Sequence, residues 1–469
     1  MQCSVRFLIL VTVAVHIPTA SIAQPPNVIL IISDDQSWAD YGFMGHPVIQ
    51  TPHLDRLASR GALFRRGYVP TALCRPSLAT LATGLYASQH GITGNDPVRL
   101  PSATKPQYRQ LQSELISKID GRPTLPKLLG LAGYRSYQSG KWWEGNFRRG
   151  GFSHGMTRGF PEPGGRHGDD GLKIGRTGLS PVLDFIDESA LQQRPFFVWY
   201  APFLPHIPHN PPDRLLDKYT APNRPSEQAC YFAMCEWLDE TCGELLEHVR
   251  QRNLSENTLI VYISDNGWIQ RTPQTPVPDG WNTQFAPRSK QSPYEGGVRT
   301  PVILCWPGRI EPGERLDVVS SVDLVPTILA AAGVSPPTEL PGINLFSVLQ
   351  GSQPLQREAI YGEGFAHDIS DLDNPQDSLL YRWVIRDRWK LILTYDGKVS
   401  HYRVIHQNVE RRPQLFDVLA DPHEESNVAA DHPQLVAQLA QRIANWWTVD
   451  ERTVQTIPGR INRIPGFDF

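Results

Sequence analysis

Four segments of the chain predict the strands of one buried sheet. Residues 27–32 and 258–263 are almost entirely apolar, and the segments at 133–139 and 195–200 are candidates for two more strands. Uninterrupted apolar runs are typical of parallel strands, because helices cover such sheets on both faces. Helical patterns separate the strands, over residues 51–61, 124–132 and 226–252. The alternation predicts an α/β fold with a mainly parallel sheet sandwiched by helices.

A different pattern follows the helix that we expect over residues 322–332. The stretch Gly-Ser-Gln-Pro at 351–354 interrupts the chain. Beyond it, short segments of strand character and one helix are expected, at residues 380–385, 389–395, 414–417 and 434–447. We therefore expect a large domain over residues 24–354 and a small C-terminal α+β domain, an antiparallel sheet plus a helix, over residues 355–469.

The first 23 residues have the pattern of a secretory signal peptide. Arg6 precedes an apolar stretch from Phe7 to Val15, and small residues lead up to Ala23. The stretch is too short to span a bilayer, and Pro18 interrupts it. We expect cleavage near Ala23 and a secreted or periplasmic product. Later segments fall short of the roughly 20 apolar residues that a span needs, so we expect no membrane span in the mature chain.

Charge and cysteine content narrow the functional classes. The 469 residues contain 45 Lys and Arg against 48 Asp and Glu, a formal net charge of -3, which argues against a nucleic-acid partner. Once Cys3 is removed with the signal, five cysteines remain at spacings that match no zinc pattern. Neither a disulfide framework nor a zinc site is indicated.

Acidic and amide side chains follow both of the strongest predicted strands. Asp34 and Asp35 end the first, and Asp265 and Asn266 end the second. Such oxygen ligands suit Ca²⁺ or Mg²⁺. Either pair alone is also explained by a helix cap or a turn. Their recurrence after two matching strands favours one shared metal site, because ligands gather outside the carboxyl ends of parallel strands.

Cys74 stands at the expected start of a helix. It lies two residues before Pro76, and Gly84 would end the helix. A side chain at this position faces free backbone N–H groups and the positive end of the helix dipole, which favour an anion. A cysteine that is simply packed at a helix start is the alternative.

These residues belong to a set of segments that resembles the type I sulfatases of the alkaline-phosphatase superfamily. The resemblance covers most of the mature chain, and its motifs together are specific. They are Asn-Val-Ile-Leu-Ile-Ile-Ser-Asp-Asp-Gln at 27–36, Cys-x-Pro-Ser at 74–77, Gly-Lys-Trp at 140–142, Pro-His-Ile-Pro at 205–208, Ser-Asp-Asn-Gly at 264–267, Lys290 before Tyr-Glu-Gly-Gly-Val-Arg at 294–299, Leu-Phe-Asp at 415–417 and Asp-Pro-His-Glu at 421–424.

The resemblance implies an alkaline-phosphatase-like catalytic domain and a role for each motif. A modifying enzyme, the formylglycine-generating enzyme or another maturase, would oxidise Cys74 to formylglycine, whose hydrate attacks the sulfur of a sulfate ester. Lys141 and Lys290 would bind the substrate and balance the charge on its oxygens. His206 would contact the substrate and protonate the leaving alcohol. The covalent sulfate would then leave by elimination. The implied metal is Ca²⁺, with Mg²⁺ as the alternative, and its ligands are Asp34, Asp35, Cys74, Asp265 and Asn266.

Two positions depart from the family pattern. Leu78 stands where the family has an arginine that the modifying enzyme also reads, so Cys74 has two possible forms, formylglycine or free thiol. Trp143 stands where the family has a histidine. Arg75 is the candidate for a substrate-binding cation in place of the missing arginine. Further candidates for charge or proton transfer are His90, His154 and Arg148. Trp142, Trp143 and Phe147 are either core aromatics, which we favour, or a stacking surface for a sugar ring.

The leading hypothesis is an exported, calcium-dependent sulfatase that acts on a sulfated carbohydrate or a related sulfate ester. A phosphate or phosphonate ester hydrolase on the same scaffold is the second hypothesis, since tetrahedral oxyanions need similar charges. The third is a binding protein for sulfated glycans that has lost turnover, motivated by Leu78 and Trp143. A Ser-His-Asp hydrolase is disfavoured because the single Gly-x-Ser-x-Gly match, at residues 151–155, does not directly follow one of the predicted strands.

Overall fold

The structure is a computed structural model. It describes residues 25–100, 102–278, 282–350, 355–395 and 412–449. The expected signal peptide and its cleavage position lie outside the described residues.

The larger of the two main sheets has eight strands in the order β5-β4-β6-β1-β7-β8-β2-β9. The strands are β1 (Asn27–Ser33), β2 (Ala62–Tyr68), β4 (Arg135–Gly140), β5 (His154–Gly155), β6 (Phe196–Ala201), β7 (Thr258–Ser264), β8 (Arg299–Cys305) and β9 (Gly313–Ser320). β1 lies between β6 and β7 and is parallel to both, whereas β8 is antiparallel to its two neighbours. The mainly parallel sheet and its four predicted strands are confirmed.

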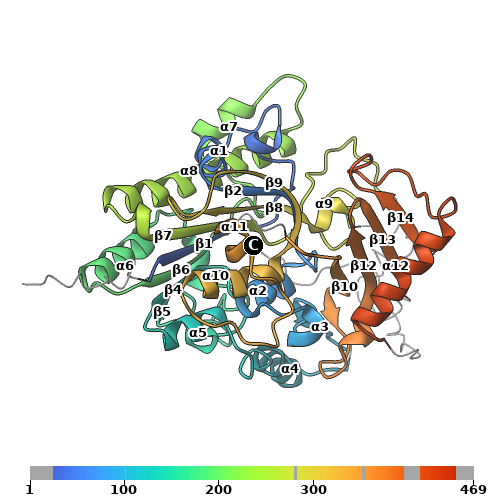
Figure 1. The fold of residues 1–469 in the computed structure, drawn as a ribbon, viewed down its shortest axis with the longest axis horizontal. Coiled ribbons are helices and arrows are strands. Elements are labelled where there is room, and N and C mark those ends of the chain that lie inside the picture. The colour runs from blue at the N-terminus through green and yellow to red at the C-terminus, as the bar shows by residue number, and fades with distance from the viewer. Residues whose placement is uncertain (1–24, 101, 279–281, 351–354, 396–411, 450–469) are drawn as a thin grey trace, which may run out of the picture.

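Helices cover both faces of this sheet (Figure 1). Val28, Leu30 and Ile32 of β1 pack on the side of α2 (Cys74–Thr83), α5 (Leu125–Leu131), α10 (Leu324–Ala331) and α11 (Leu345–Gln350). Ile29 and Ile31 pack on the side of α1 (Pro52–Arg60), α6 (Ser180–Leu191) and α8 (Ser226–Gln251). Successive side chains of a strand point to opposite faces, so an apolar run such as β1 serves two hydrophobic cores.

The second main sheet is antiparallel and has the order β10-β12-β13-β14. Its strands are β10 (Ile360–Phe365), β12 (Leu379–Arg386), β13 (Trp389–Thr394) and β14 (Gln414–Asp417). One face packs against α12 (Pro433–Trp446) through Leu439 and Ile443, and α12 lies along this sheet in Figure 1. The other face places Tyr381 and Trp383 in the same core cluster as β1. The predicted small antiparallel sheet with one helix is therefore confirmed.

A third, two-stranded sheet connects the two parts of the chain. In it, β3 (Asp96–Pro97) pairs in parallel with β11 (Asp368–Ile369). The remaining helices are α3 (Ala87–His90), α4 (Lys105–Ser117), α7 (Asp213–Tyr219) and α9 (Glu295–Val298), with short 3-10 turns at Gly42–Met44, Phe147–Gly150, Asp169–Lys173, Ser255–Asn257, Ser321–Asp323 and Pro375–Ser378. Within the described residues, none of the helices combines the length and the apolar character needed to cross a membrane.

Candidate active site

The ends of β1 and β7 bring the two acidic segments together. Ser33 and Ser264 are paired at the last register position of the two parallel strands. The next residues are held by direct bonds between the segments, since the N–H of Asp35 donates to Asp265 Oδ1 at 3.0 Å and the N–H of Asp265 donates to Ser33 O at 2.9 Å. The strand register thus places the expected ligands at one edge of the sheet.

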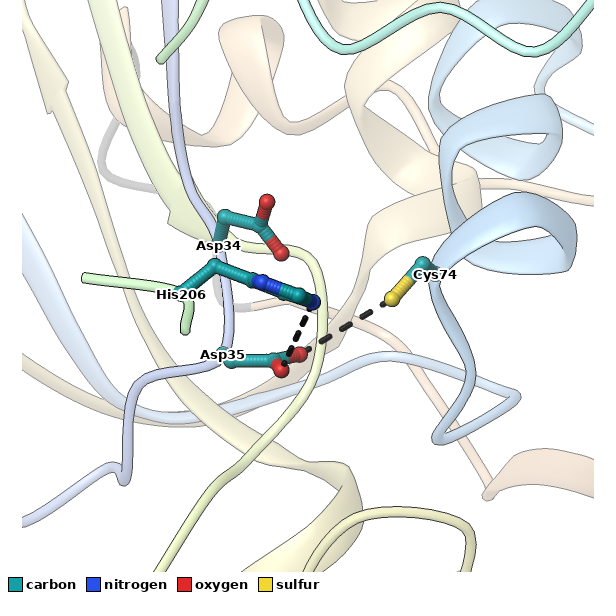
Figure 2. Close-up of side chains that lie close together, drawn as sticks. All are labelled: Asp34, Asp35, Cys74 and His206. Atoms are coloured by element: carbon teal, nitrogen blue, oxygen red, sulfur yellow. Dashed lines mark hydrogen bonds and ion pairs between the residues drawn. The ribbon is translucent and has the colours of Figure 1, made fainter. Parts of the chain in front are cut away.

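Asp34 and Asp35 contribute to one cluster although they are sequence neighbours. In a regular strand their side chains would point to opposite faces. Asp35 instead has a left-handed backbone, with φ of 62°, which interrupts the alternation. Ligand atoms of Asp34, Asp35, Cys74 and His206 all lie within 4.8 Å of one another (Figure 2). His206 was not among the predicted metal ligands.

The oxygen atoms at this edge fit a divalent cation. Among the described residues, Asp34 Oδ2, Asp265 Oδ2 and Asn266 Oδ1 are buried and accept no hydrogen bond. Buried oxygens of this kind are costly unless a donor or a cation reaches them. Burial raises the pKa of both Asp34 and Asp265, and repulsion from neighbouring carboxylates adds to this while Lys141 opposes it. A hard cation between these oxygens would offset both the burial and the repulsion.

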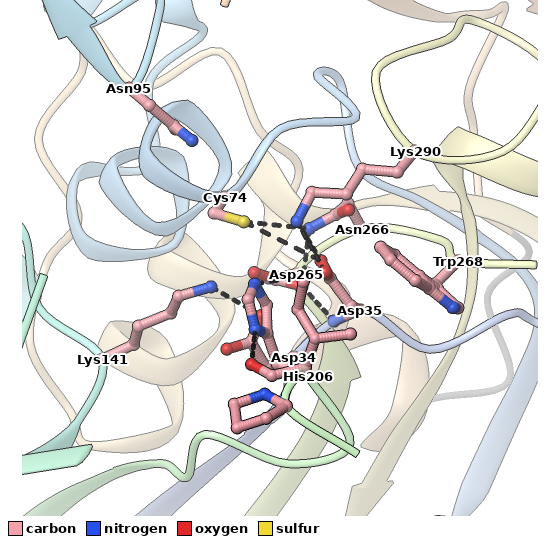
Figure 3. Close-up of polar contacts among 12 residues, drawn as sticks. Asp34, Asp35, Cys74, Asn95, Lys141, His206, Asp265, Asn266, Trp268 and Lys290 are labelled. Atoms are coloured by element: carbon pink, nitrogen blue, oxygen red, sulfur yellow. Dashed lines mark hydrogen bonds and ion pairs between the residues drawn. The ribbon is translucent and has the colours of Figure 1, made fainter. Parts of the chain in front are cut away.

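Two buried lysines reach the same carboxylates (Figure 3). Lys141 Nζ lies 2.7 Å from Asp34 Oδ1, and Lys290 Nζ lies 2.6 Å from both carboxylate oxygens of Asp35. Burial alone would lower the pKa of each lysine, but the carboxylates raise it above the usual value, so both side chains carry a charge at neutral pH. The site therefore concentrates positive charge beside Cys74.

Gly140 sets the position of Lys141. It ends β4 with φ of 79°, a conformation that favours glycine. A Cβ on this residue would lie 1.8 Å from the carbonyl oxygen of Ala201 on β6. The close approach lets the N–H of Lys141 donate to that same oxygen at 2.7 Å, which turns the lysine from the strand towards Asp34.

Cys74 is the first residue of α2 and is buried. Its Sγ lies 3.8 Å from Asp35 Oδ1 and 3.8 Å from Asn266 Nδ2. Burial raises the pKa of the thiol to about 12, although the nearby lysines oppose the shift. Because the thiolate is the nucleophilic form of cysteine, unmodified Cys74 would be a poor nucleophile at neutral pH.

His206 faces the cluster from the segment after β6. Its Nδ1 lies 2.6 Å from the carbonyl oxygen of Ile207, which assigns the hydrogen to Nδ1 and leaves Nε2 directed at Asp35 Oδ2, 3.4 Å away. Burial, Lys141 and Lys290 all lower its pKa, so the ring is neutral at pH 7 in this arrangement. The ring also stacks on Phe203, with centroids 4.3 Å apart.

Arg75 occupies a different place from the one expected. Its guanidinium binds both carboxylate oxygens of Glu144, at 2.8 and 2.7 Å, and donates to the backbone oxygen of Asn95 at 3.0 Å. Arg75 is absent from the described lining of the pocket that contains Cys74. The predicted direct contact of Arg75 with substrate is therefore not supported by its position. Glu144 neutralises the charge of Arg75 in this arrangement, and the role of Arg75 in place of the missing arginine stays a prediction.

The other candidates for compensation also lie elsewhere. His90 is buried behind α2, 3.3 Å from the Thr80 hydroxyl, and His154 lies in β5 beside Arg135. Neither of them, nor Arg148 or Phe147, lines the described part of the pocket. Trp142 packs in the core, where its ring contacts those of Phe152 and Trp199. Trp143 does line the pocket, although it also belongs to the core cluster that includes Leu78.

The pocket has further polar and aromatic walls that sequence reasoning missed. Beside Asp35, Cys74, Lys141, His206 and Lys290, its lining includes Asn95, Arg166, His167, Trp268, Gln284 and His367. Only Trp268 carried a local signal, because it directly follows the Ser-Asp-Asn-Gly segment at 264–267. The others are single residues in loops, where no periodic pattern marks a function.

Comparison with known families decides the identity of this site. A sequence model described as sulfatase matches residues 26–334. The chain belongs to the sulfatase family. A second model, described as N-sulphoglucosamine sulphohydrolase, C-terminal, matches residues 287–448 of this sulfatase. The family resemblance seen in the motifs is thus confirmed across the part of the chain that contains both main sheets.

Individual relatives agree with the family assignment. The sulfatase is 33% identical over 396 residues to the N-acetylgalactosamine-6-sulfatase of Canis lupus familiaris, which covers 76% of this chain and 72% of the relative. It is 30% identical over 389 residues to the arylsulfatase A of Homo sapiens, covering 73% and 71%. The crystal structure of Ps i-CgsB superposes with a TM-score of 0.68 and 25% identity, over 90% of this chain and 93% of that one. The protein is a sulfuric ester hydrolase with the sulfatase fold.

Proposed function

We propose that this sulfatase is an exported, metal-dependent enzyme that removes sulfate from a sulfated carbohydrate through a formylglycine derived from Cys74. The observation that carries the proposal is the convergence of Cys74 with three buried, unpaired oxygens and two buried lysines at one edge of the sheet. The name of the N-acetylgalactosamine-6-sulfatase relative supports a sulfated sugar as the substrate class.

One group of side chains would hold the metal ion, and two lysines would stabilise the charge of the sulfate. Asp34, Asp35, Asp265 and Asn266 would hold Ca²⁺ or Mg²⁺. The ion would supply Lewis acidity, which lowers the pKa of the attacking hydroxyl and neutralises sulfate oxygens. Lys141 and Lys290, now bound to carboxylates, line the same pocket as Cys74 and would donate hydrogen bonds to a sulfate bound there. Such fixed donors stabilise the charge that spreads over the oxygens during displacement.

His206 is positioned for the proton of the leaving alcohol. Its Nδ1 hydrogen is fixed by Ile207 O, so Nε2 is the atom that faces the pocket. When Nε2 carries a proton, the ring can deliver it to the leaving oxygen. The neighbouring lysines disfavour that proton in the structure, so bound sulfate, which adds negative charge, would favour it.

The state of residue 74 is the first test. In this test the protein is expressed in a host that contains a formylglycine-generating enzyme. The mass of the peptide that contains residue 74 is then measured by mass spectrometry. Conversion of the thiol to the aldehyde removes about 18 Da and is expected to accompany release of sulfate from sulfated monosaccharides, since the hydrate is the nucleophile. Fully converted protein that releases no sulfate from any ester would contradict the proposal.

Leu78 motivates a second candidate for the unconverted protein. By the family resemblance, Leu78 stands where the modifying enzyme would read an arginine, and burial raises the pKa of the Cys74 thiol to about 12. A thiol form would keep the metal and anion site and bind sulfated glycans without turnover.

Rates on sulfate and phosphate esters of one alcohol separate the sulfatase from the phosphate or phosphonate ester hydrolase, which would prefer the phosphate.

A further inference from the structure

A second polar cluster borders the pocket beside Cys74. The pairing of β3 with β11 brings Asn95 and His367 together, and the N–H of Asn95 donates to the His367 carbonyl oxygen at 2.9 Å. A third segment adds Arg166. Asn95, Arg166 and His367 line the same pocket as Cys74, while Asp96 and Asp368 support them from behind. None of the family motifs includes these five residues.

The cluster is built from one ion pair and one histidine that is hydrogen-bonded to a carboxylate. His367 Nδ1 lies 2.7 Å from Asp368 Oδ1, so this nitrogen carries a hydrogen, and Nε2 lies 3.2 Å from Asn95 Nδ2, from which it accepts. Arg166 Nε lies 3.1 and 3.2 Å from the two oxygens of Asp96, and a terminal nitrogen of the guanidinium makes a third contact with the same carboxylate. The Arg166 guanidinium also lies over the ring of Trp143, 4.7 Å from its centroid.

This arrangement suits hydroxyl groups better than ions. Ligand atoms of Asp96, His367 and Asp368 lie within 4.8 Å of one another, but Arg166 already neutralises the first carboxylate and His367 hydrogen-bonds the last. A cation would have to displace the guanidinium. A second sulfate would meet two carboxylates behind the donors, and like charges repel. A neutral hydroxyl can accept a hydrogen bond from the Arg166 guanidinium, or donate to His367 Nε2 in place of the Asn95 amide.

We propose that the Arg166–Asp96 and His367–Asp368 pairs form a subsite that binds two adjacent unsulfated hydroxyls of the sugar whose sulfate lies at Cys74. The inference rests on the proposed function and narrows its substrate class to sugars with a free vicinal diol beside the sulfated position. Trp143 lines the same wall, and its ring holds the Arg166 guanidinium in place from one face.

Arg75 connects this subsite to the nucleophile. Its backbone N–H donates to Asn95 Oδ1 at 3.0 Å, and its guanidinium donates to Asn95 O at 3.0 Å. Asn95 in turn contacts His367. The residue that follows Cys74 therefore fixes the distance between the site of sulfur attack and the diol subsite. Arg75 is a positioning residue in this arrangement.

The test compares variants on substrates with and without the hydroxyls. Wild type, Arg166→Ala and His367→Ala are assayed for kcat/KM on singly sulfated hexoses and on their deoxy analogues, each lacking one hydroxyl next to the sulfated position. For each variant, kcat/KM on the best hexose sulfate should fall roughly 10²-fold, because a polar group left unpaired in the site is costly. On the analogue that lacks the matching hydroxyl, wild type and variant should have the same kcat/KM, which measures the coupling directly.

Controls separate the subsite from the fold and from the proposed function. Arg149→Ala removes an exposed arginine paired with Asp120 and should match wild type on every substrate. Arg166→Lys keeps the charge but not the planar fork, so it should recover only part of the activity. Equal losses on parent and analogues would overturn the subsite alone. If wild type releases sulfate from no sulfated sugar, the proposed function and the subsite are both wrong.

Discussion

At the scale of single residues, the unusual feature is that the residue after Cys74 is held in a buried ion pair. Leu78 is buried in the core cluster, and the neighbouring guanidinium of Arg75 is bound by Glu144. Both partners of this ion pair are almost fully buried, with 4% and 3% of their side chains exposed. Buried pairs of this kind stabilise a specific arrangement only while both partners are present.

Removal of either partner should therefore destabilise the protein. Arg75→Ala and Glu144→Ala should each lower the free energy of unfolding by about 3 kcal/mol or more, because a buried charge is left alone. The loss in free energy of unfolding should be clearly smaller in the double variant than the sum of the losses in the two single variants. Denaturant titration of the four proteins measures this coupling. Strictly additive losses would show that the pair does not act as a unit.

A second prediction at this scale concerns pH. Burial raises the pKa of Glu363 to about 7, and one of its oxygens has no hydrogen-bond partner among the described residues. In this carboxyl group the folded state holds the proton more tightly than the unfolded state. Between pH 4.5 and 7 the unfolded state thus binds fewer protons than the folded state. The ionisation of Glu363 therefore lowers the free energy of unfolding as the pH rises through this range.

Glu363→Gln should remove that contribution. The variant should gain stability relative to wild type as the pH rises from 5 to 8, by an amount on the order of 3 kcal/mol at the upper end. Free energies of unfolding measured at several pH values provide the comparison. Glu339→Gln, on the exposed surface, is the matched control and should follow wild type. A constant difference between Glu363→Gln and wild type across this range would refute the assignment.

At the scale of elements, strand ends position the chemistry. β1 and β7 end side by side, and β4 ends at Gly140, whose left-handed backbone turns Lys141 into the site. The strands with strong apolar runs were predictable. β8 was missed because Pro301 argues against a strand, and β2 because Arg65 and Arg66 interrupt its apolar pattern.

Gly140→Ala tests the strand-end geometry. The added Cβ would meet the Ala201 carbonyl oxygen, so β4 and Lys141 have to shift. We expect a loss of about 2 kcal/mol or more in stability and at least a tenfold fall in kcat for sulfate release. Gly130→Ala is the control, since open space surrounds this helical glycine and alanine favours helix. Equal behaviour of the two variants would argue against the role of Gly140.

At the scale of the whole molecule, the two main sheets share one core, and the active-site pocket takes residues from both parts of the chain. The candidate metal site lies at the edge of the larger sheet, where three carboxylate side chains and one amide side chain come together. Repulsion among the carboxylates of Asp34, Asp35 and Asp265 is a cost to folding that a bound cation would offset. Metal binding and stability should therefore be coupled.

Removal of divalent ions should lower both activity and stability. Dialysis against a chelator should abolish sulfate release and lower the melting temperature by several degrees. Ca²⁺ at about 100 times its Kd should then raise the free energy of unfolding by about 3 kcal/mol. Asp265→Asn should reduce the Ca²⁺-dependent shift, because one anionic ligand is lost. A melting temperature that is independent of Ca²⁺ and chelator would show that these oxygens do not hold the ion.

The sequence alone determined the central strands, the polar residues at their ends and the helix start at Cys74, because these features depend on local patterns and on how parallel strands align. It also identified the family through its motifs. The contact of Arg75 with Glu144 joins positions 69 residues apart, and that of Asn95 with His367 joins positions 272 apart. Only the tertiary structure decided these pairs, since the packing of the whole chain, and no local pattern, brings such isolated polar residues together.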